Sequence, residues 1–221
     1  NASQGVVTAV QALVDDATSR NQRTHLVATS LGYGGVLYGM QHIAARSNAT
    51  YALADLVYPH DVTAEVISSQ IRALLPNNGE PIVVVLDHIT SETGVLFPVD
   101  EIITSLRATH SHARFVIDAA HSAGMLEHPL PQHYDVWIGN LHKWLCAPRP
   151  AAALICGSSE VAALMKNVAF TNAQMGDVLA WRLDNNASYD EAAVYFLTTY
   201  KDVWGDWLSA DAKGKLAAIL N

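Results

Sequence analysis

Two opposite charges at the ends of apolar runs are the residues best placed to do chemistry in this sequence. Asp118 closes the run FVID, and Lys143 follows the next run, DVWIG, directly after His142. A carboxylate at the end of a buried strand needs a cation or several hydrogen-bond donors to stay ionised. Asp118 and Lys143 can therefore flank one ligand, or they can simply pair with each other.

The beginning of the chain is a candidate anion site. The letters NAS precede apolar residues at helical spacing, which predicts a helix N-terminus around Ser3 and Gln4. Free N–H groups at a helix N-terminus attract phosphates, although a serine there is more often only a cap. Together with the carboxylate and the lysine, this segment favours an aldehyde cofactor with a phosphate and a ring nitrogen, as in pyridoxal phosphate.

The elements that must position these residues alternate along the chain. Apolar runs predict strands at 24–29, 50–58, 80–90, 113–121, 134–140 and 151–157. Helical patterns are predicted at 5–17, 33–47, 61–75 with Asp61 as its cap, 98–110 and 158–168. Buried strands separated by helices predict an α/β three-layer sandwich with a mostly parallel sheet, which binds ligands at the carboxyl ends of its strands.

The alternation ends near residue 167. Residues 170–188 read as irregular, and two more helices are predicted at 189–203 and near 211–220. No linker is apparent between these parts.

Composition narrows the classes of partner. The formal net charge of −8 argues against nucleic acid, which binds basic stripes. No apolar run approaches the ~18 residues that cross a bilayer, so no membrane partner is expected. The two cysteines are too few for a disulfide framework and no metal-ligand spacing appears, which favours a reducing, cytoplasmic location and predicts no metal.

Several motifs, in their order and spacing, resemble the class V aminotransferase family of fold-type I pyridoxal phosphate enzymes. The matching stretches are NASQGV (1–6), GYGGV (32–36), VVVLDHITSETGVLFPVDEI (83–102), FVIDAAHSAG (115–124) and GNLHKWLCAPR (139–149). The branch most similar to them is that of isopenicillin N epimerase and related C–S lyases. The resemblance implies a homodimer and a large, cofactor-binding domain over 1–205. That domain is expected to be incomplete at its N-terminus, with 206–221 a helical remnant and the small domain absent.

The resemblance also implies roles for the matching residues. Lys143 is expected to hold pyridoxal phosphate as a Schiff base, Asp118 to pair with the pyridine nitrogen, and His121 to lie near the phenolic oxygen of the ring. Tyr33 occupies the position where this family stacks an aromatic side chain on the ring. Near the phenolic oxygen the resemblance also places Thr90 or Ser91. The residues expected to hold the phosphate are Ala2, Ser3, Gln4, Asn140 and His142.

Some parts of the family's pattern are absent or altered. The small domain normally supplies an arginine for the substrate carboxylate, and no arginine follows Gly205. A loop in which a threonine reaches the partner subunit's phosphate reads WRLDNNASY here, without that threonine. We therefore weigh an active enzyme against a catalytically impaired homologue that keeps the fold as a binding or interaction module.

For an active enzyme the expected substrate is a small amino acid, with sulfur-containing ones among the candidates. C–S lyase, epimerase and transaminase chemistry all begin by removing the Cα proton, and the resemblance places the lyase slightly ahead. A persulfide-forming desulfurase is disfavoured, because Cys146 lies three residues after Lys143 and Cys156 ends an apolar strand. Both cysteines are predicted to be small core residues.

Overall fold

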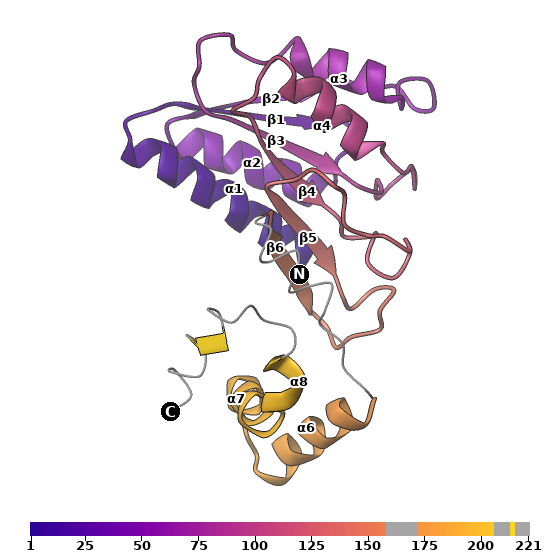
Figure 1. Ribbon diagram of the computed structural model, residues 1–221. Coiled ribbons are helices and arrows are strands. Elements are labelled where there is room, and N and C mark those ends of the chain that lie inside the picture. Colours follow the sequence, from indigo (N-terminus) through magenta and orange to yellow (C-terminus); the bar gives the residue numbers. More distant parts are fainter. Residues whose placement is uncertain (158–171, 206–212, 215–221) are drawn as a thin grey trace. The chain divides into compact units, whose positions relative to one another are not determined.

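A six-stranded sheet lies at the centre of residues 1–157 (Figure 1). Its strands are β1 (Thr24–Thr29), β2 (Ala49–Ala54), β3 (Ile82–Asp87), β4 (Arg114–Asp118), β5 (Val136–Asn140) and β6 (Ala152–Cys156). The order across the sheet is β2-β1-β3-β4-β5-β6, and every neighbouring pair is parallel except β5 and β6. This confirms the predicted α/β fold with a mostly parallel sheet.

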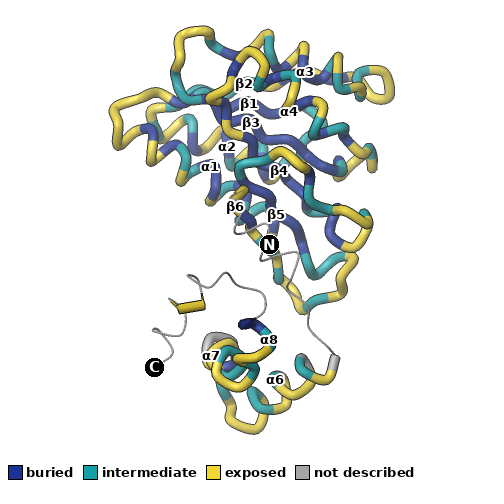
Figure 2. Tube along the Cα trace, in the orientation of Figure 1, coloured by how far each residue is buried: buried dark blue, intermediate teal, exposed yellow. Residues whose placement is uncertain are grey.

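Helices cover both faces of the sheet, as the unbroken apolar strands require. Helices α1 (Ala2–Ser19) and α2 (Gly34–Arg46) lie on one face, and α3 (Ala64–Arg72) and α4 (Val99–Arg107) lie on the other (Figure 1). All six residues of β3 are buried, and the sheet forms the buried centre of this part of the chain in Figure 2. In the described part of the chain, no helix is both long and apolar enough to cross a membrane.

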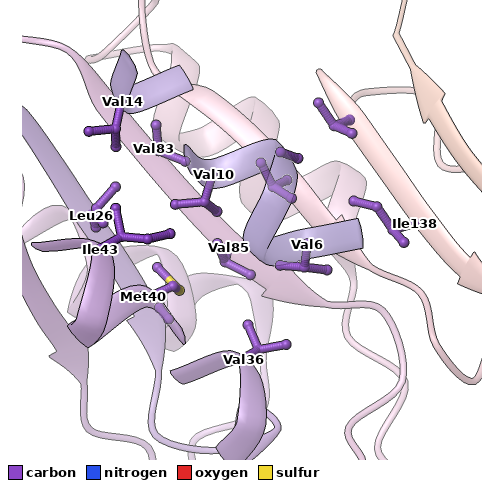
Figure 3. Close-up of a cluster of buried hydrophobic side chains, with 14 of the residues drawn as sticks. Val6, Val10, Val14, Leu26, Val36, Met40, Ile43, Val83, Val85 and Ile138 are labelled. Carbon is purple, nitrogen blue, oxygen red and sulfur yellow. The ribbon is translucent and has the colours of Figure 1, made fainter. Parts of the chain in front are cut away.

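The core under α1 fixes the position of that helix on the sheet. Val6, Val10 and Val14 recur at helical spacing on one side of α1 and are fully buried against Val83 and Val85 of β3 (Figure 3). Each buried valine contributes about 1.5–3 kcal/mol relative to an exposed one. The N-terminus of α1 is thereby held against the sheet.

Gly5 lets the first turn of α1 approach strand β5 closely. A Cβ atom at this position would lie 2.8 Å from Cγ2 of Ile138, which is closer than carbon atoms pack. A larger residue would therefore push the helix N-terminus away from the strand.

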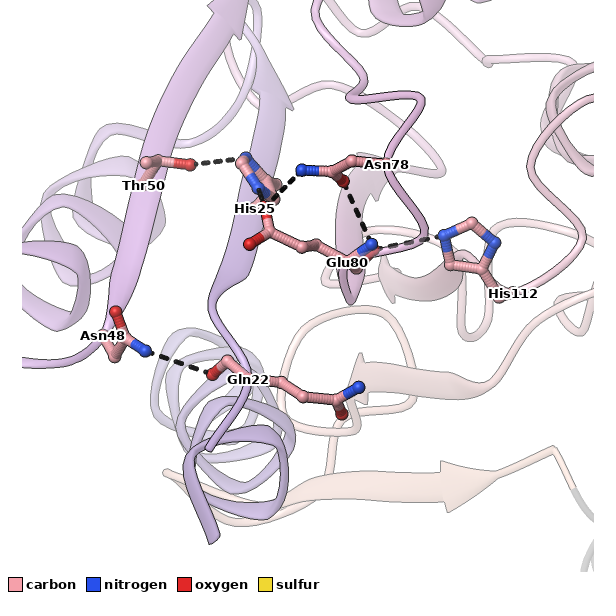
Figure 4. Close-up of polar contacts among 7 residues, drawn as sticks. All are labelled: Gln22, His25, Asn48, Thr50, Asn78, Glu80 and His112. Carbon is pink, nitrogen blue, oxygen red and sulfur yellow. Dashed lines mark hydrogen bonds and ion pairs between the residues drawn. The ribbon is translucent and has the colours of Figure 1, made fainter. Parts of the chain in front are cut away.

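A polar cluster joins four segments at the amino ends of the strands (Figure 4). His25 of β1 contacts Glu80 through Nε2, with 2.6 Å to Oε2, and Thr50 of β2 through Nδ1, with 2.9 Å to Oγ1. Asn78 donates to the same carboxylate, and Nε2 of His112 lies 3.1 Å from the carbonyl oxygen of Glu80. We interpret this cluster as structural, because it lies at the edge opposite to the strands' carboxyl ends.

The structure describes residues 1–157, 172–205 and 213–214, and the chain forms two compact units, 1–157 and 158–221. The first unit ends just after β6, where the sheet is complete. This division lies at 157 rather than at 205, and the extension of the cofactor-binding domain to 205 stays a prediction.

Two predictions about helices were wrong: the residue that caps α3, and the absence of a helix in 170–188. Helix α3 is capped by Thr63, whose Oγ1 accepts from the N–H of Val66, because Asp61 instead accepts from the N–H of Val57 and closes the preceding turn. The segment read as irregular contains helix α6 (Asn172–Asp184).

The second unit also contains two helices where one was predicted. Helices α7 (Tyr189–Thr199) and α8 (Lys201–Gly205) are separated at Tyr200. Contacts between α6 and α7 compensate for the weak helical pattern of α6: the rings of Trp181 and Tyr195 stack at 4.3 Å, and Tyr195 donates to Asp177. The predicted helix at 158–168, and all but residues 213–214 of the last one, lie outside the described residues.

Candidate functional site

A cavity of about 220 Å³ lies at the carboxyl ends of the parallel strands. In the sheet, β1 has β2 as its neighbour on one side and β3 on the other, so the strand order reverses at β1. The cavity adjoins this point, and α/β sheets bind ligands at such reversals of strand order. Its volume suits a small organic molecule rather than a single ion, because one water molecule occupies only ~30 Å³ of the liquid. The predicted residues that line it are Ser3, Tyr33, Ser91, Asp118, His121, Asn140, His142 and Lys143.

Lys143 and His121 are in direct contact inside this cavity. The Lys143 Nζ lies 3.0 Å from Nε2 of His121, although the two residues follow different strands. Burial lowers the pKa of Lys143, and the negative charge of Asp118 partly offsets this effect. Burial and then the charge of Lys143 lower the pKa of His121. A neutral imidazole is thus favoured, and its Nε2 accepts a hydrogen bond from the lysine.

Asp118 is the buried carboxylate that the sequence predicted. It is 3% exposed at the end of β4, and its Oδ1 accepts from the N–H of Ala120 at 3.0 Å. Burial raises the pKa of Asp118, whereas this hydrogen bond and then the charge of Lys143 lower it. A cationic group bound in the cavity would relieve the cost of this buried charge.

The N-terminus of α1 forms one end of the cavity. Asn1 caps the helix by accepting from the N–H of Gln4, and Asn140 of β5 accepts from the N–H of Ala2 at 2.8 Å. Ala2 and Gln4 are outside the cavity lining, and their amides are already used in these contacts. Ser3 does line the cavity, and no hydrogen bond of its N–H is found within the described part of the chain. This amide is therefore the one left to bind an anion.

His142 lines the same cavity and has a defined ring orientation. Its Nδ1 lies 2.7 Å from the carbonyl oxygen of Ala151, so Nδ1 must carry a proton and donate it. Nε2 is left for a ligand. Asn140 is held in a similar way, because its Oδ1 accepts from α1, while its amide nitrogen has no hydrogen-bond partner among residues 1–157, 172–205 and 213–214.

Of the alternatives Thr90 and Ser91, the structure places Ser91 at the cavity. Thr90 is buried, and its Oγ1 contacts Thr93 Oγ1 at 2.7 Å and accepts from the N–H of Val95 at 2.8 Å. The Thr90 hydroxyl is therefore used to shape its own loop.

Tyr33 is the aromatic wall of the cavity. Its backbone caps α2, and the side chain remains 46% exposed. A Cβ atom at Gly35 would lie 2.8 Å from the Tyr33 ring, so the glycine leaves room for the ring in this position.

Asp87 also lines the cavity, and sequence reasoning missed it. It closes the apolar run IVVVLD of β3 in the way that Asp118 closes β4, so the same signal was present. Burial and then the negative charge of Asp118 raise the pKa of Asp87 well above its usual range.

The prediction that both cysteines are core residues was wrong. Cys146 and Cys156 are both exposed thiols. Cys156 lies on the antiparallel strand β6 at the edge of the sheet, where one side of the strand has no neighbour among the described residues. Cys146 lies only three residues after Lys143, and this short spacing still disfavours Cys146 as the remote, mobile thiolate of a persulfide-forming desulfurase.

Residues 1–178 match the family model for aminotransferase class-V. Over 128 residues the chain is 34% identical to a putative L-cysteine desulfhydrase 1 of Oryza sativa subsp. japonica, covering 56% of this chain and 26% of that protein. It is 30% identical over 139 residues to a probable chloroplastic L-cysteine desulfhydrase of Arabidopsis thaliana, covering 61% of this chain and 29% of that one. The matched region thus spans less than a third of these relatives.

Solved structures show the same fold. The complex of the cystine C–S lyase C-DES with cysteine persulfide aligns with a TM-score of 0.51 and 25% identity, covering 62% of this chain and 36% of the lyase. Mouse CSAD aligns with a TM-score of 0.58 over 78% of this chain and 39% of that one, and at 17% identity it shows the fold alone.

Proposed function

Because the chain belongs to the class V aminotransferase family, we propose that it binds pyridoxal phosphate in this cavity and serves C–S bond cleavage of a small, sulfur-containing amino acid. The family match confirms the resemblance carried by the motifs. The observation that carries the proposal is the meeting of Lys143, His121 and Asp118 in one cavity. These residues come from two separate strand ends, and a lysine beside a buried carboxylate suits an aldehyde cofactor with a basic ring nitrogen.

The described residues include a partner for each part of such a cofactor. Asp118 would pair with the ring nitrogen, Tyr33 would cover the ring, and Lys143 would hold the aldehyde carbon covalently. His121 and Ser91 would bind the phenolic oxygen. The residues available for the phosphate are Ser3, Asn140 and His142.

When bound, pyridoxal phosphate supplies an electron sink that makes the Cα proton of an amino acid removable. Lys143 is the base placed to take this proton, and its lowered pKa makes the neutral amine more available than that of an ordinary lysine. His121 orients the amine through the 3.0 Å contact to Nζ.

The choice of C–S cleavage among related reactions rests on the relatives. The names of the curated proteins describe L-cysteine desulfhydrases, and that of the solved lyase describes a cystine C–S lyase. Transamination and epimerisation begin with the same proton removal, so the cavity favours all three equally. A binding module without turnover is the second candidate, which the altered loop WRLDNNASY favours.

We further propose that the chain acts as a homodimer in the cytoplasm. Trp144, Leu145 and Met125 are exposed near Lys143, and a second subunit would cover them. The two unpaired thiols, Cys146 and Cys156, support a reducing compartment.

The experiment compares the visible absorption of the purified chain with and without added pyridoxal phosphate, for the wild type, Lys143→Ala and Lys201→Ala. Lys201 is an exposed lysine of α8 and serves as the matched control. An imine band is expected in the wild type and in Lys201→Ala but not in Lys143→Ala. Adding cysteine and measuring sulfide and pyruvate then separates the lyase from the other reactions, and cysteine left intact would count against the lyase.

A further inference from the structure

Two buried carboxyl groups, those of Asp87 and Asp118, lie on neighbouring strand ends and line the cavity, although the proposed chemistry uses only one. The two residues are direct partners in the parallel pairing of β3 with β4, and both strands end there. They are 5% and 3% exposed, and both line the cavity. Burying a second carboxyl group is costly, so its presence calls for a role.

Asp87 contacts the loop that carries Tyr33. Its carboxyl group accepts a hydrogen bond from the backbone N–H of Tyr33. A Cβ atom at Gly32 would lie 3.3 Å from Oδ2 of Asp87, which shows how closely the loop backbone passes this group. The strand end and the start of α2 are thus joined at one side chain.

The charges around the two carboxyl groups are unequal. Asp118 has the N–H of Ala120 and the ammonium group of Lys143 to support a negative charge. Hydrogen bonds from the backbone N–H groups of Tyr33 and of Asp87 itself lower the pKa of Asp87, but burial and then the negative charge of Asp118 raise it, and no cation of the described residues supports its negative charge. The other titratable side chains that line the cavity are those of Tyr33, His121 and His142. When two carboxyl groups share such a site, the better supported one ionises and its neighbour keeps its proton.

We propose that Asp87 is a positioning residue: as an uncharged carboxyl group it holds the backbone of the Tyr33 loop beside the Asp118 carboxylate. The inference rests on the proposed function, because it assigns to Tyr33 the task of covering the cofactor ring. Asp87 itself need not touch the cofactor. Its carbonyl oxygen accepts from the loop, and the proton keeps a second negative charge away from Asp118.

An uncharged carboxyl group has a conservative replacement in asparagine, which has a similar shape and keeps the accepting oxygen. Asp87→Asn is therefore expected to behave like the wild type in holding the loop, whereas Asp87→Ala is not. If Asp87 were instead the ionised partner of a bound cation, Asp87→Asn would be as harmful as Asp118→Asn.

Hydrogen exchange of the Tyr33 amide, measured in protein freed of cofactor, tests the loop contact without any requirement for cofactor binding. Asp87→Ala is expected to accelerate this exchange on the order of tenfold, the effect of losing one hydrogen bond, and Asp87→Asn to stay within about twofold of the wild type. Amides of β2, away from the cavity, serve as the internal control. Unchanged exchange in Asp87→Ala, or Asp87→Asn as fast as Asp87→Ala, overturns the proposal.

The wild type provides a second measurement that does not depend on any variant folding. The ¹³C resonance of the Asp87 carboxyl group is expected to be that of a protonated acid at neutral pH, and that of an ionised carboxylate would contradict the proposal. Titration of wild type, Asp87→Asn and Asp118→Asn with pyridoxal phosphate tests the proposed function separately from the role of Asp87. Failure of the wild type to bind rejects the proposed function, while the exchange and ¹³C results still decide whether Asp87 holds the loop.

Discussion

The Nζ atom of Lys143 lies 3.0 Å from Nε2 of His121, and the carboxylate of Asp118 lies close enough to raise the pKa of the same lysine. A single amine is thus placed between a neutral hydrogen-bond acceptor and a negative charge. Burial is the larger influence on Lys143 and lowers its pKa. The balance of these effects sets the pH at which the amine becomes reactive.

Asp118→Asn should move the reactivity of Lys143 to lower pH. The substitution removes the negative charge that raises the pKa of Lys143, and the desolvation that lowers it remains. The measurement is the pH dependence of labelling of Lys143 by an amine-specific reagent, with Lys201 as the reference lysine in the same sample. A shift of the Lys143 profile to higher pH would show that Asp118 does not act on this amine.

Asp87→Asn should stabilise the fold at neutral pH. The pKa of Asp87 is raised in the folded protein, so this group contributes stability that is present below its unfolded pKa of ~3.9 and is lost as pH rises toward the folded value. Asparagine removes that loss, because it does not ionise in the unfolded chain. Thermal unfolding should give a higher midpoint for Asp87→Asn at pH 7, by about 2–4 °C for each kcal/mol gained, and the difference should shrink as pH falls. A difference that grows toward acid would contradict the account.

Glu80→Gln should have the opposite pH dependence. Hydrogen bonds from His25 and Asn78 lower the pKa of Glu80, so its contribution to stability is present above the unfolded pKa of ~4.3 and is lost as pH falls through the folded value. The unfolding midpoint of Glu80→Gln should lie below that of the wild type at pH 7, and the two should converge in acid. Equal midpoints at pH 7 would mean that the cluster in Figure 4 adds no stability.

Gly5→Val should weaken binding of the cofactor phosphate. The new side chain would collide with Ile138 of β5 and push the first turn of α1, with Ser3, away from the cavity. A titration with pyridoxal phosphate should show a higher dissociation constant. Gly176→Ala is the control, because no atom of the residues that the structure describes lies within 4 Å of a Cβ atom there. Equal affinity in both variants would argue against α1 as the phosphate end of the site.

The sequence was sufficient to predict the site where local pattern and topology agree. Asp118 and Lys143 each follow an apolar run, and parallel strands bring their carboxyl ends to one edge, so their meeting at one cavity could be expected. Asp87 satisfied the same rule. It was missed because reasoning from opposite charges sought one carboxylate for one lysine, although Asp87 closes its apolar run as Asp118 does.

Other features depended on contacts that a sequence does not display. Helix α6 forms although its own pattern is weak, because Trp181 and Asp177 contact Tyr195 of α7. Cys156 is exposed because β6 turns back antiparallel and becomes an edge strand, whereas its apolar run favoured a buried one. The use of the Thr90 hydroxyl inside its own loop likewise required the folded geometry.

The most direct test of the central claim is to reduce the protein with borohydride in the presence of pyridoxal phosphate and to map the modified peptide by mass spectrometry. Reduction fixes an imine as a stable amine, so it marks the lysine that holds the cofactor. We predict one modified residue, Lys143, with the label lost in Lys143→Ala and kept in Lys201→Ala. Labelling of a different lysine, or of none, would contradict the assignment of this cavity as a pyridoxal phosphate site.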